Sequence, residues 1–243
     1  MKKNVLIVGA TSDVAQALAR LRAENGHNLW LTGRSLENLE PILSDLRIRY
    51  EVEALGFIYN AELTSPEHLL SNLPGLPDEV HVAIGYLGNP NCIDDAVEGS
   101  RILTVNFSAV VYLMNALMHS FIQAKKQAVM VGISSVAGDR GRKSNFLYGA
   151  AKAGFSTYLD GLRNFGYAHG IHIVTVKPGF IRSKMTAGLP LPGPLTATPQ
   201  QVANAIVKAV KKRKGRIYVL PIWQLIMLVI RTIPDFIFKK LNL

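Results

Sequence analysis

Short apolar runs alternate with longer amphipathic stretches along this chain of 243 residues. The short runs predict buried parallel strands, because such strands are apolar on both faces. The longer stretches repeat apolar residues three and four positions apart, as helices do. Strands are predicted at residues 5–8, 29–31, 52–58, 80–84, 128–133, 171–176 and 217–220. Helices are predicted at residues 13–24, 102–124, 146–168 and 200–211, and a polar helix that follows the second strand is predicted to end at about residue 49.

Strands that alternate with helices predict an α/β fold, a doubly wound parallel sheet of about seven strands flanked by helices. We expect residues 1–220 to form this domain and residues 221–243 to form a C-terminal helical extension, apolar and basic. The Pro- and Gly-rich stretch 188–199 predicts a loop between the sixth strand and the next helix. Such loops often close over a ligand.

Positive charge is concentrated at the C-terminal end of the chain. The net charge is +10, and residues 208–243 carry nine Lys or Arg against one acid. The apolar run 222–230 is too short to span a bilayer, which takes about twenty residues. A basic, apolar segment favours contact with an anionic membrane surface. The alternative is a core or dimer-interface helix, whereas nucleic acid is disfavoured because basic and aromatic residues do not interleave.

One cysteine, Cys92, excludes an intrachain disulfide and suits a reducing cytoplasm. The apolar run 5–8 is too short for a signal peptide, and polar residues 11–13 interrupt it. We therefore expect a cytoplasmic protein; the alternative is peripheral binding at the inner face of the membrane. No metal site is predicted.

Tyr148 and Lys152 stand four residues apart in a predicted helix, and Ser135 lies thirteen residues upstream of the tyrosine. Residues four apart share a helix face, so the ammonium group is expected to lower the pKa of the phenol. A tyrosine of this kind exchanges a proton with a carbonyl or alcohol oxygen, and a serine hydroxyl can hold the same oxygen. The alternative is a Tyr–Lys pair on an ordinary helix surface.

The turn after the first strand has small residues where a dinucleotide diphosphate binds at a helix N-terminus. We expect cofactor contacts from Gly9, Thr11, Ser12, Asp13 and Val14. Asp13 is unexpected beside a diphosphate and is interpreted as an N-cap. Arg34 follows the second strand where NAD sites commonly have an acid, which favours NADP(H) over NAD(H). The alternatives are a plain turn and a surface arginine.

Together, Gly9, Ser135, Tyr148 and Lys152 resemble the short-chain dehydrogenase/reductase family, from about residue 3 to 219. The resemblance implies a Rossmann-type fold, hydride transfer between a nicotinamide and a carbonyl carbon, and a homodimer or homotetramer. It makes Tyr148 the general acid in reduction and lets Lys152 also hold the nicotinamide ribose. It implies that Asn106 is the helix asparagine that supports a proton-relay water. It places Glu62 and Leu63 near the adenine. It also implies a segment that holds the nicotinamide carboxamide: Pro178, Gly179, Ile181 and Ser183.

The chain departs from the family pattern at two places. Asp13 and Ala15 replace glycines, and of the Asn-Asn-Ala-Gly motif after the fourth strand only Gly85 remains. One branch is more similar: the turn 9–13, the run 178–182 and the tail 225–231 resemble decaprenylphosphoryl-2-keto-pentose reductases. That resemblance implies a keto sugar on a lipid carrier as substrate.

The leading hypothesis is an NADPH-dependent reductase that converts a ketone on a lipidic or lipid-linked substrate to a secondary alcohol. A second hypothesis is a soluble ketoacyl or small-carbonyl reductase with a dimerising tail. A third is a non-catalytic NADP(H)-binding module.

Overall fold

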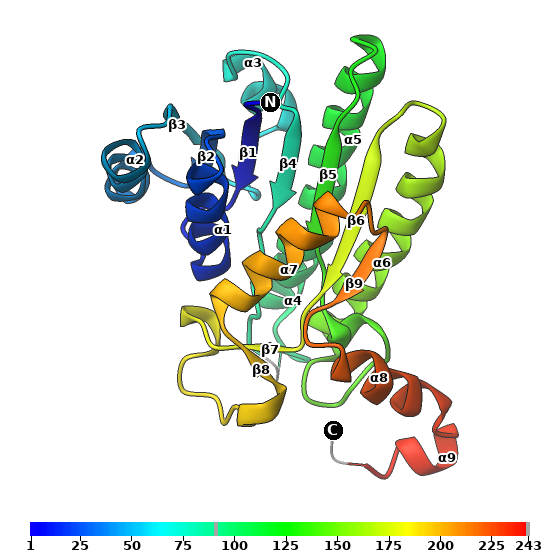
Figure 1. Ribbon diagram of the computed structural model, residues 1–243. Coiled ribbons are helices and arrows are strands. Elements are labelled where there is room, and N and C mark those ends of the chain that lie inside the picture. Colours follow the sequence, from blue (N-terminus) through cyan, green and yellow to red (C-terminus); the bar gives the residue numbers. More distant parts are fainter. Residues whose placement is uncertain (90–91, 242–243) are drawn as a thin grey trace.

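A single parallel sheet of seven strands runs through the computed structural model of the protein, which describes residues 1–89 and 92–241. The strand order is β3-β2-β1-β4-β5-β6-β9, with every neighbouring pair parallel. The predicted doubly wound α/β fold is therefore confirmed (Figure 1). The strands are β1 (Asn4–Val8), β2 (Asn28–Gly33), β3 (Ala54–Ile58), β4 (Glu79–Val82), β5 (Val129–Ile133), β6 (His172–Lys177) and β9 (Arg216–Tyr218).

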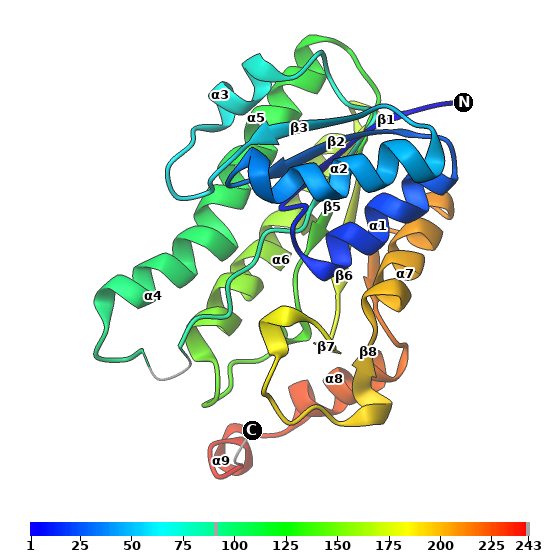
Figure 2. The same ribbon diagram turned by 90° about the vertical axis from the view of Figure 1, so that its left-hand side faces the viewer.

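Two layers of helices cover the sheet. Successive residues of a strand point to opposite faces, so Val5 and Ile7 pack into one core while Leu6 and Val8 pack into the other. The first layer is α1 (Asp13–Glu24), α2 (Leu36–Tyr50) and α7 (Pro199–Lys211). The second layer is α3 (Pro66–Asn72), α4 (Ala96–Leu103), α5 (Ala109–Gln123) and α6 (Phe146–Tyr167) (Figure 2).

Side-chain caps fix several helix starts. Ser12 caps α1 by accepting a hydrogen bond from the Ala15 N–H, and Ser65 caps the short α3 in the same way. Helix α3 was not predicted, because its seven residues give too short a periodic signal. At α7, Thr198 and Gln201 form a capping box, with a proline at the first helical position.

The predicted helix 102–124 begins earlier, at Ala96, where Asp95 is the N-cap. A π-helical turn, Thr104–Ser108, separates α4 from α5. Within the described residues, Ala96–Gln123 is the one helical stretch long and apolar enough to cross a membrane on those two criteria, and half of its apolar window is buried in the fold.

The stretch expected as a loop at 188–199, and the residues just before it, contain ordered elements. Strand β7 (Phe180–Ile181) pairs with β8 (Thr196–Ala197), and 3₁₀ turns form at Lys184–Thr186 and Gly193–Leu195. The C-terminal segment forms α8 (Ile222–Thr232) and α9 (Asp235–Phe238). Both lie beyond the carboxyl edge of the sheet, on the same side of the molecule as β7 and β8 (Figure 1).

Candidate active site

A cleft of about 480 Å³ opens at the carboxyl ends of the strands. Parallel α/β sheets bind ligands at this edge, because the strand-to-helix loops converge there. The cleft is lined by residues from the turns after β1, β4 and β5, from the start of α6, and from the segment after β6. A neighbouring pocket of about 180 Å³ shares Thr11, Ser12, Arg34 and Gly85 with it, so the two form one continuous groove.

Ser135 and the Tyr148–Lys152 pair meet in this cleft because the segment after β5 packs tightly on the start of α6. Gly138 permits that approach, since a Cβ there would lie 2.6 Å from the Lys152 carbonyl carbon. The Ser134 hydroxyl donates to the Lys152 carbonyl at 3.0 Å. Ser135, Tyr148 and Lys152 all line the cleft, so the structure brings the three predicted catalytic residues together.

The phenol of Tyr148 is not acidified in this structure. Burial raises its pKa to about 12, and a hydrogen bond with the Ser135 side chain acts in the opposite direction. Lys152 is not among the causes of this shift, so the expected lowering of the Tyr148 pKa by the ammonium group is not seen in the ligand-free chain. At neutral pH the phenol carries its proton, as a general acid must before it donates.

The Lys152 ammonium lies near the Tyr148 ring and is also hydrogen-bonded to a backbone carbonyl. It donates to the Ile133 carbonyl at 3.2 Å and sits 5.7 Å from the centroid of the Tyr148 ring. The side chain is buried, and this burial lowers its pKa to about 8. A Cβ on Gly85 would lie 3.9 Å from the ammonium nitrogen, which places Lys152 directly beneath the turn after β4.

Asn106 lies behind the cleft rather than in its lining. It occupies the π-helical turn and is fully buried. Its Nδ2 donates to the Tyr86 and Ile102 carbonyls, at 2.6 and 2.9 Å, and its Oδ1 accepts from the Tyr86 N–H at 3.1 Å. This side chain therefore fixes the backbone that follows β4.

The turn between β1 and α1 brings Thr11, Ser12, Asp13 and Val14 to the cleft, and Gly9 to the adjoining pocket. The prediction that Asp13 caps α1 is wrong, because Ser12 occupies the N-cap position. The Asp13 carboxylate instead accepts a hydrogen bond from the Lys184 backbone N–H. The Asp13 carboxylate therefore binds the segment after β7.

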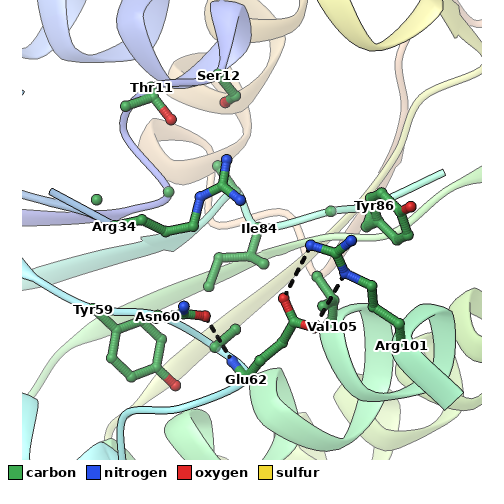
Figure 3. A pocket seen from close by; sticks show the side chains of 15 residues that line it. Thr11, Ser12, Arg34, Tyr59, Asn60, Glu62, Ile84, Tyr86, Arg101 and Val105 are labelled. Atoms are coloured by element: carbon green, nitrogen blue, oxygen red, sulfur yellow. Dashed lines mark hydrogen bonds and ion pairs between the residues drawn. The ribbon is translucent and has the colours of Figure 1, made fainter. Parts of the chain in front are cut away.

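Arg34 reaches the adjoining pocket from the end of β2, and Figure 3 shows it on the opposite side from an ion pair between Glu62 and Arg101. The Arg101 Nε lies 3.1 Å from Glu62 Oε1, and its guanidinium stacks 4.5 Å from the Tyr86 ring centroid. Leu63 is 84% exposed and does not line the pocket. Arg34 is exposed and makes no ion pair with any described residue.

The segment after β6 forms the wall opposite α6. Pro178, Gly179, Ile181 and Ser183, which the resemblance assigns to the carboxamide, line the cleft. The ring of Trp223 in α8 packs directly against Gly179, where any Cβ would collide with it. Its Nε1 donates to the Leu195 carbonyl at 3.0 Å, so α8 is tied to the segment between β7 and β8.

A buried ion pair supports this wall from behind. Lys177, at the end of β6, pairs with Asp139, and the Tyr218 hydroxyl donates to the same carboxylate at 2.8 Å. The Val136 N–H also donates to the Pro178 carbonyl at 3.0 Å. These contacts fix the segment that carries Ser135 relative to the Pro178–Gly179 turn.

Several lining residues were missed by the sequence analysis. They come from loops, from α4, from β7 and from the C-terminal helix α8: Tyr59, Asn60, Ile84, Tyr86, Leu87, Arg101, Arg142, Asn145, Phe180 and Trp223. Only Trp223 left a usable signal, since Trp223 and Met227 stand four apart in an apolar run.

A parallel sheet with a glycine turn after β1 and a Ser–Tyr–Lys group at its carboxyl edge defines a Rossmann-type oxidoreductase. The family model for short chain dehydrogenases matches residues 3–191. The chain belongs to the short-chain dehydrogenase/reductase family, whose members are NAD(P)-dependent enzymes.

Known proteins similar to the chain agree with this family. An uncharacterised oxidoreductase of Mycobacterium tuberculosis is 28% identical over 242 residues, covering 98% of this chain and 96% of the relative. Among solved structures, a short-chain dehydrogenase from Sphingobium yanoikuyae in complex with NADPH has a TM-score of 0.81 at 23% identity, with 96% of each chain covered. An actinorhodin polyketide ketoreductase variant with NADPH has a TM-score of 0.79 at 19% identity, covering 90% and 95%. At these identities the structural likeness shows the fold alone.

Proposed function

We propose that the protein is an NADPH-dependent reductase that converts a ketone to a secondary alcohol. The observation that carries the proposal is the meeting of Ser135, Tyr148 and Lys152 in one cleft. That cleft continues into a pocket lined by Arg34, a cation that forms no ion pair within the described part of the chain. A proton donor and a cofactor groove are thereby joined, as a reductase requires.

The groove fits NADP(H) by its chemistry. The turn 9–14 lies at the N-terminus of α1, where a diphosphate is favoured. The exposed Arg34 guanidinium suits a 2′-phosphate, since a planar cation can pair with it and also stack on a base. Glu62 lies at the far side of the same pocket, near the expected adenine position. Two neighbours of the same fold carry NADPH, which agrees with this assignment.

Each residue of the cleft has a role in the proposal. When bound, NADPH supplies the hydride that reduces the carbonyl carbon. Tyr148, protonated at neutral pH, donates its proton to the carbonyl oxygen, and the Ser135 hydroxyl orients that oxygen. Lys152 places a positive charge near the phenol and near the nicotinamide ribose. Asn106 positions the turn after β4 against Lys152.

The proposed substrate has a lipidic or lipid-linked character. Phe180, Met185, Leu189 and Trp223 line the cleft, and Met185 and Leu189 are about half exposed at its edge. An apolar entrance of this kind suits an acyl or prenyl chain better than a small polar ketone. A keto sugar on a lipid carrier, implied by the similarity to one branch of the family, satisfies both the apolar entrance and the ketone chemistry.

We further propose that the extension 221–243 binds an anionic membrane surface. Helix α8 buries Trp223 and Met227 and leaves Leu225 and Leu228 more than 60% exposed. Arg231 lies in its last turn, and Lys239 and Lys240 follow α9. An exposed apolar face with surplus positive charge suits anionic headgroups.

We also propose a homodimer or homotetramer that pairs α5 and α6 with those of another copy. Large apolar and aromatic side chains stand exposed along these helices, with Tyr112 at 63% and Phe165 at 56%. Exposed patches of this kind commonly mark contact surfaces.

The experiment that tests the proposed reductase compares the wild type with Tyr148→Phe. NADPH oxidation is followed at 340 nm with a panel of ketones that differ in chain length, and NADPH binding is measured separately by fluorescence. Loss of the phenolic proton should lower kcat by at least about a hundredfold, while NADPH binding changes little. Retained turnover in Tyr148→Phe would exclude this residue as the acid, and turnover of short polar ketones alone would exclude the lipidic substrate.

A further inference from the structure

Arg142 is a cation in the wall of the cleft, on the loop between the Ser135 segment and α6. The loop carries a second arginine, Arg140, two residues earlier. Both side chains approach the C-terminal helices, but they are used differently. Arg140 has a structural role in the fold, whereas Arg142 has no ion-pair partner among the described residues.

Arg140 is fully engaged by the C-terminal segment. Its guanidinium donates to the carbonyl oxygens of Ile230 and Ile233, at 2.7 and 2.5 Å, and pairs with Asp235 at 2.7 Å. It also lies 3.8 Å from the ring centroid of Phe238. Arg140 therefore holds α8 and α9 against the domain.

Arg142 makes no ion pair with any residue in the described parts of the chain. Its one side-chain hydrogen bond is from Nη2 to the Met227 sulfur, at 3.3 Å, and a thioether is a weak acceptor. Its Nε is buried and has no hydrogen-bond partner among the described residues. A guanidinium has five donors, so most of its capacity remains unused.

The nearest acid does not neutralise Arg142. Asp139 acts on it through space, but that carboxylate already pairs with Lys177 and accepts from Tyr218. Burial lowers the pKa of Arg142, so holding its charge in the cleft wall costs free energy. A bound ligand that carries an anionic group would supply the partner that the buried guanidinium of Arg142 lacks.

We propose that Arg142 binds an oxyanion of the substrate, a carboxylate or a phosphate ester. The proposal rests on the reductase function above and defines its substrate as an anionic ketone with an apolar chain. Arg142 lies six residues before Tyr148. The anion would then bind on the same wall of the cleft as the proton donor.

Direct binding to the full-length protein, with saturating NADP⁺ to fill the Arg34 pocket, tests this inference. The probes are octyl phosphate, octanoate and octan-1-ol, which share a chain and differ in the head group. We expect isothermal titration to show octyl phosphate or octanoate binding at least about tenfold tighter than octan-1-ol, because a charge-assisted bond forms. The stronger of the two anions identifies whether the oxyanion is a phosphate or a carboxylate.

Arg142→Met should abolish this preference, and Arg142→Lys should keep part of it. The matched control is Lys143→Met, which removes the same charge from an exposed neighbour that does not line the cleft, and it should keep the full preference. Equal binding of the anions and the alcohol by the wild type would overturn the proposal. A preference that survives in Arg142→Met would overturn it as well.

The outcome is separable from that of the reductase assay. The titration needs no turnover, and NADP⁺ binding is measured in its own titration for every variant, which also reports correct folding. Anion preference without ketone reduction would retain the Arg142 site and reject the proposed reaction. Ketone reduction with no anion preference would retain the proposed reaction and reject the Arg142 site.

Discussion

The Asp13 carboxylate accepts a hydrogen bond from the Lys184 backbone N–H, with an Oδ2···N distance of 2.7 Å. The two residues are 171 positions apart. Asp13 belongs to the turn at the start of α1, and Lys184 to the 3₁₀ turn after β7. This bond links the two sides of the cleft and accounts for an acid at a position where the family pattern has glycine.

Asp13→Ala should loosen the turn at Lys184–Thr186. A hydrogen bond to a charged acceptor contributes about 1.5–3 kcal/mol when it is shielded and less at this partly exposed site. We expect trypsin to cleave after Lys184 about fivefold faster in the ligand-free variant. Time courses analysed by mass spectrometry measure the rate at that bond.

Asp13→Asn is the matched control, because its amide oxygen can still accept the hydrogen bond. Cleavage after Lys184 should stay near the wild-type rate in this variant. Equal acceleration in both variants would mean that the charge, and not the hydrogen bond, holds the turn. No change in Asp13→Ala would remove Asp13 as the link.

Arg34→Ala should weaken NADPH binding much more than NADH binding. The guanidinium is expected to contact the 2′-phosphate, which only NADPH carries. Loss of a charge-assisted pair corresponds to about a tenfold to hundredfold rise in Kd. Fluorescence titration with both cofactors gives the ratio. A similar loss of affinity for both cofactors would mean that Arg34 contacts the adenosine group that NADPH and NADH share.

Lys152→Met should stabilise the ligand-free protein at neutral pH. The Lys152 pKa is lowered from 10.5 to about 8 by burial, so the unfolded chain binds the proton more tightly than the folded one. Stability is therefore lost as the pH falls from 10.5 to 8, and the full penalty, about 3 kcal/mol, applies below pH 8. The unsatisfied Ile133 carbonyl offsets part of this gain.

Urea unfolding at pH 7 and pH 10 measures this effect. The stability difference between Lys152→Met and the wild type should be larger at pH 7 than at pH 10, by about 2 kcal/mol. A pH-independent difference would show that Lys152 titrates alike in the folded and unfolded chains.

Leu225→Gln combined with Leu228→Gln should release the protein from anionic vesicles. Both side chains are exposed on α8, whereas Trp223 and Met227 on its inner face would remain in place. Each buried leucine contributes about 1.5–3 kcal/mol to insertion, so co-sedimentation with phosphatidylglycerol vesicles should fall at least tenfold. NADPH affinity should not change.

Truncation before α8 would be a poorer test, because it also removes Trp223 from the cleft. Phosphatidylcholine vesicles are the control for charge. Wild-type protein that binds neither lipid would exclude the membrane proposal and leave α8 as a protein interface. Undiminished binding by the double variant would show that another surface inserts.

The sequence was sufficient for features that depend on neighbours along the chain. Alternating apolar runs and amphipathic stretches predicted all seven strands of the parallel sheet, because backbone periodicity and burial leave a local pattern. The four-residue spacing of Tyr148 and Lys152 placed them on one face of α6 for the same reason. Charge and hydropathy likewise located the C-terminal segment that forms α8 and α9.

The tertiary structure decided what those residues contact. Lys152 turns to the Ile133 carbonyl and Tyr148 is partly enclosed, so burial raises the phenol pKa that proximity alone was expected to lower. Segments far apart in the chain are joined where Arg142 contacts Met227 and where Trp223 packs against Gly179. Such contacts leave no periodic signal, because they depend on how whole elements pack, and only the folded chain determines the surroundings of each charge.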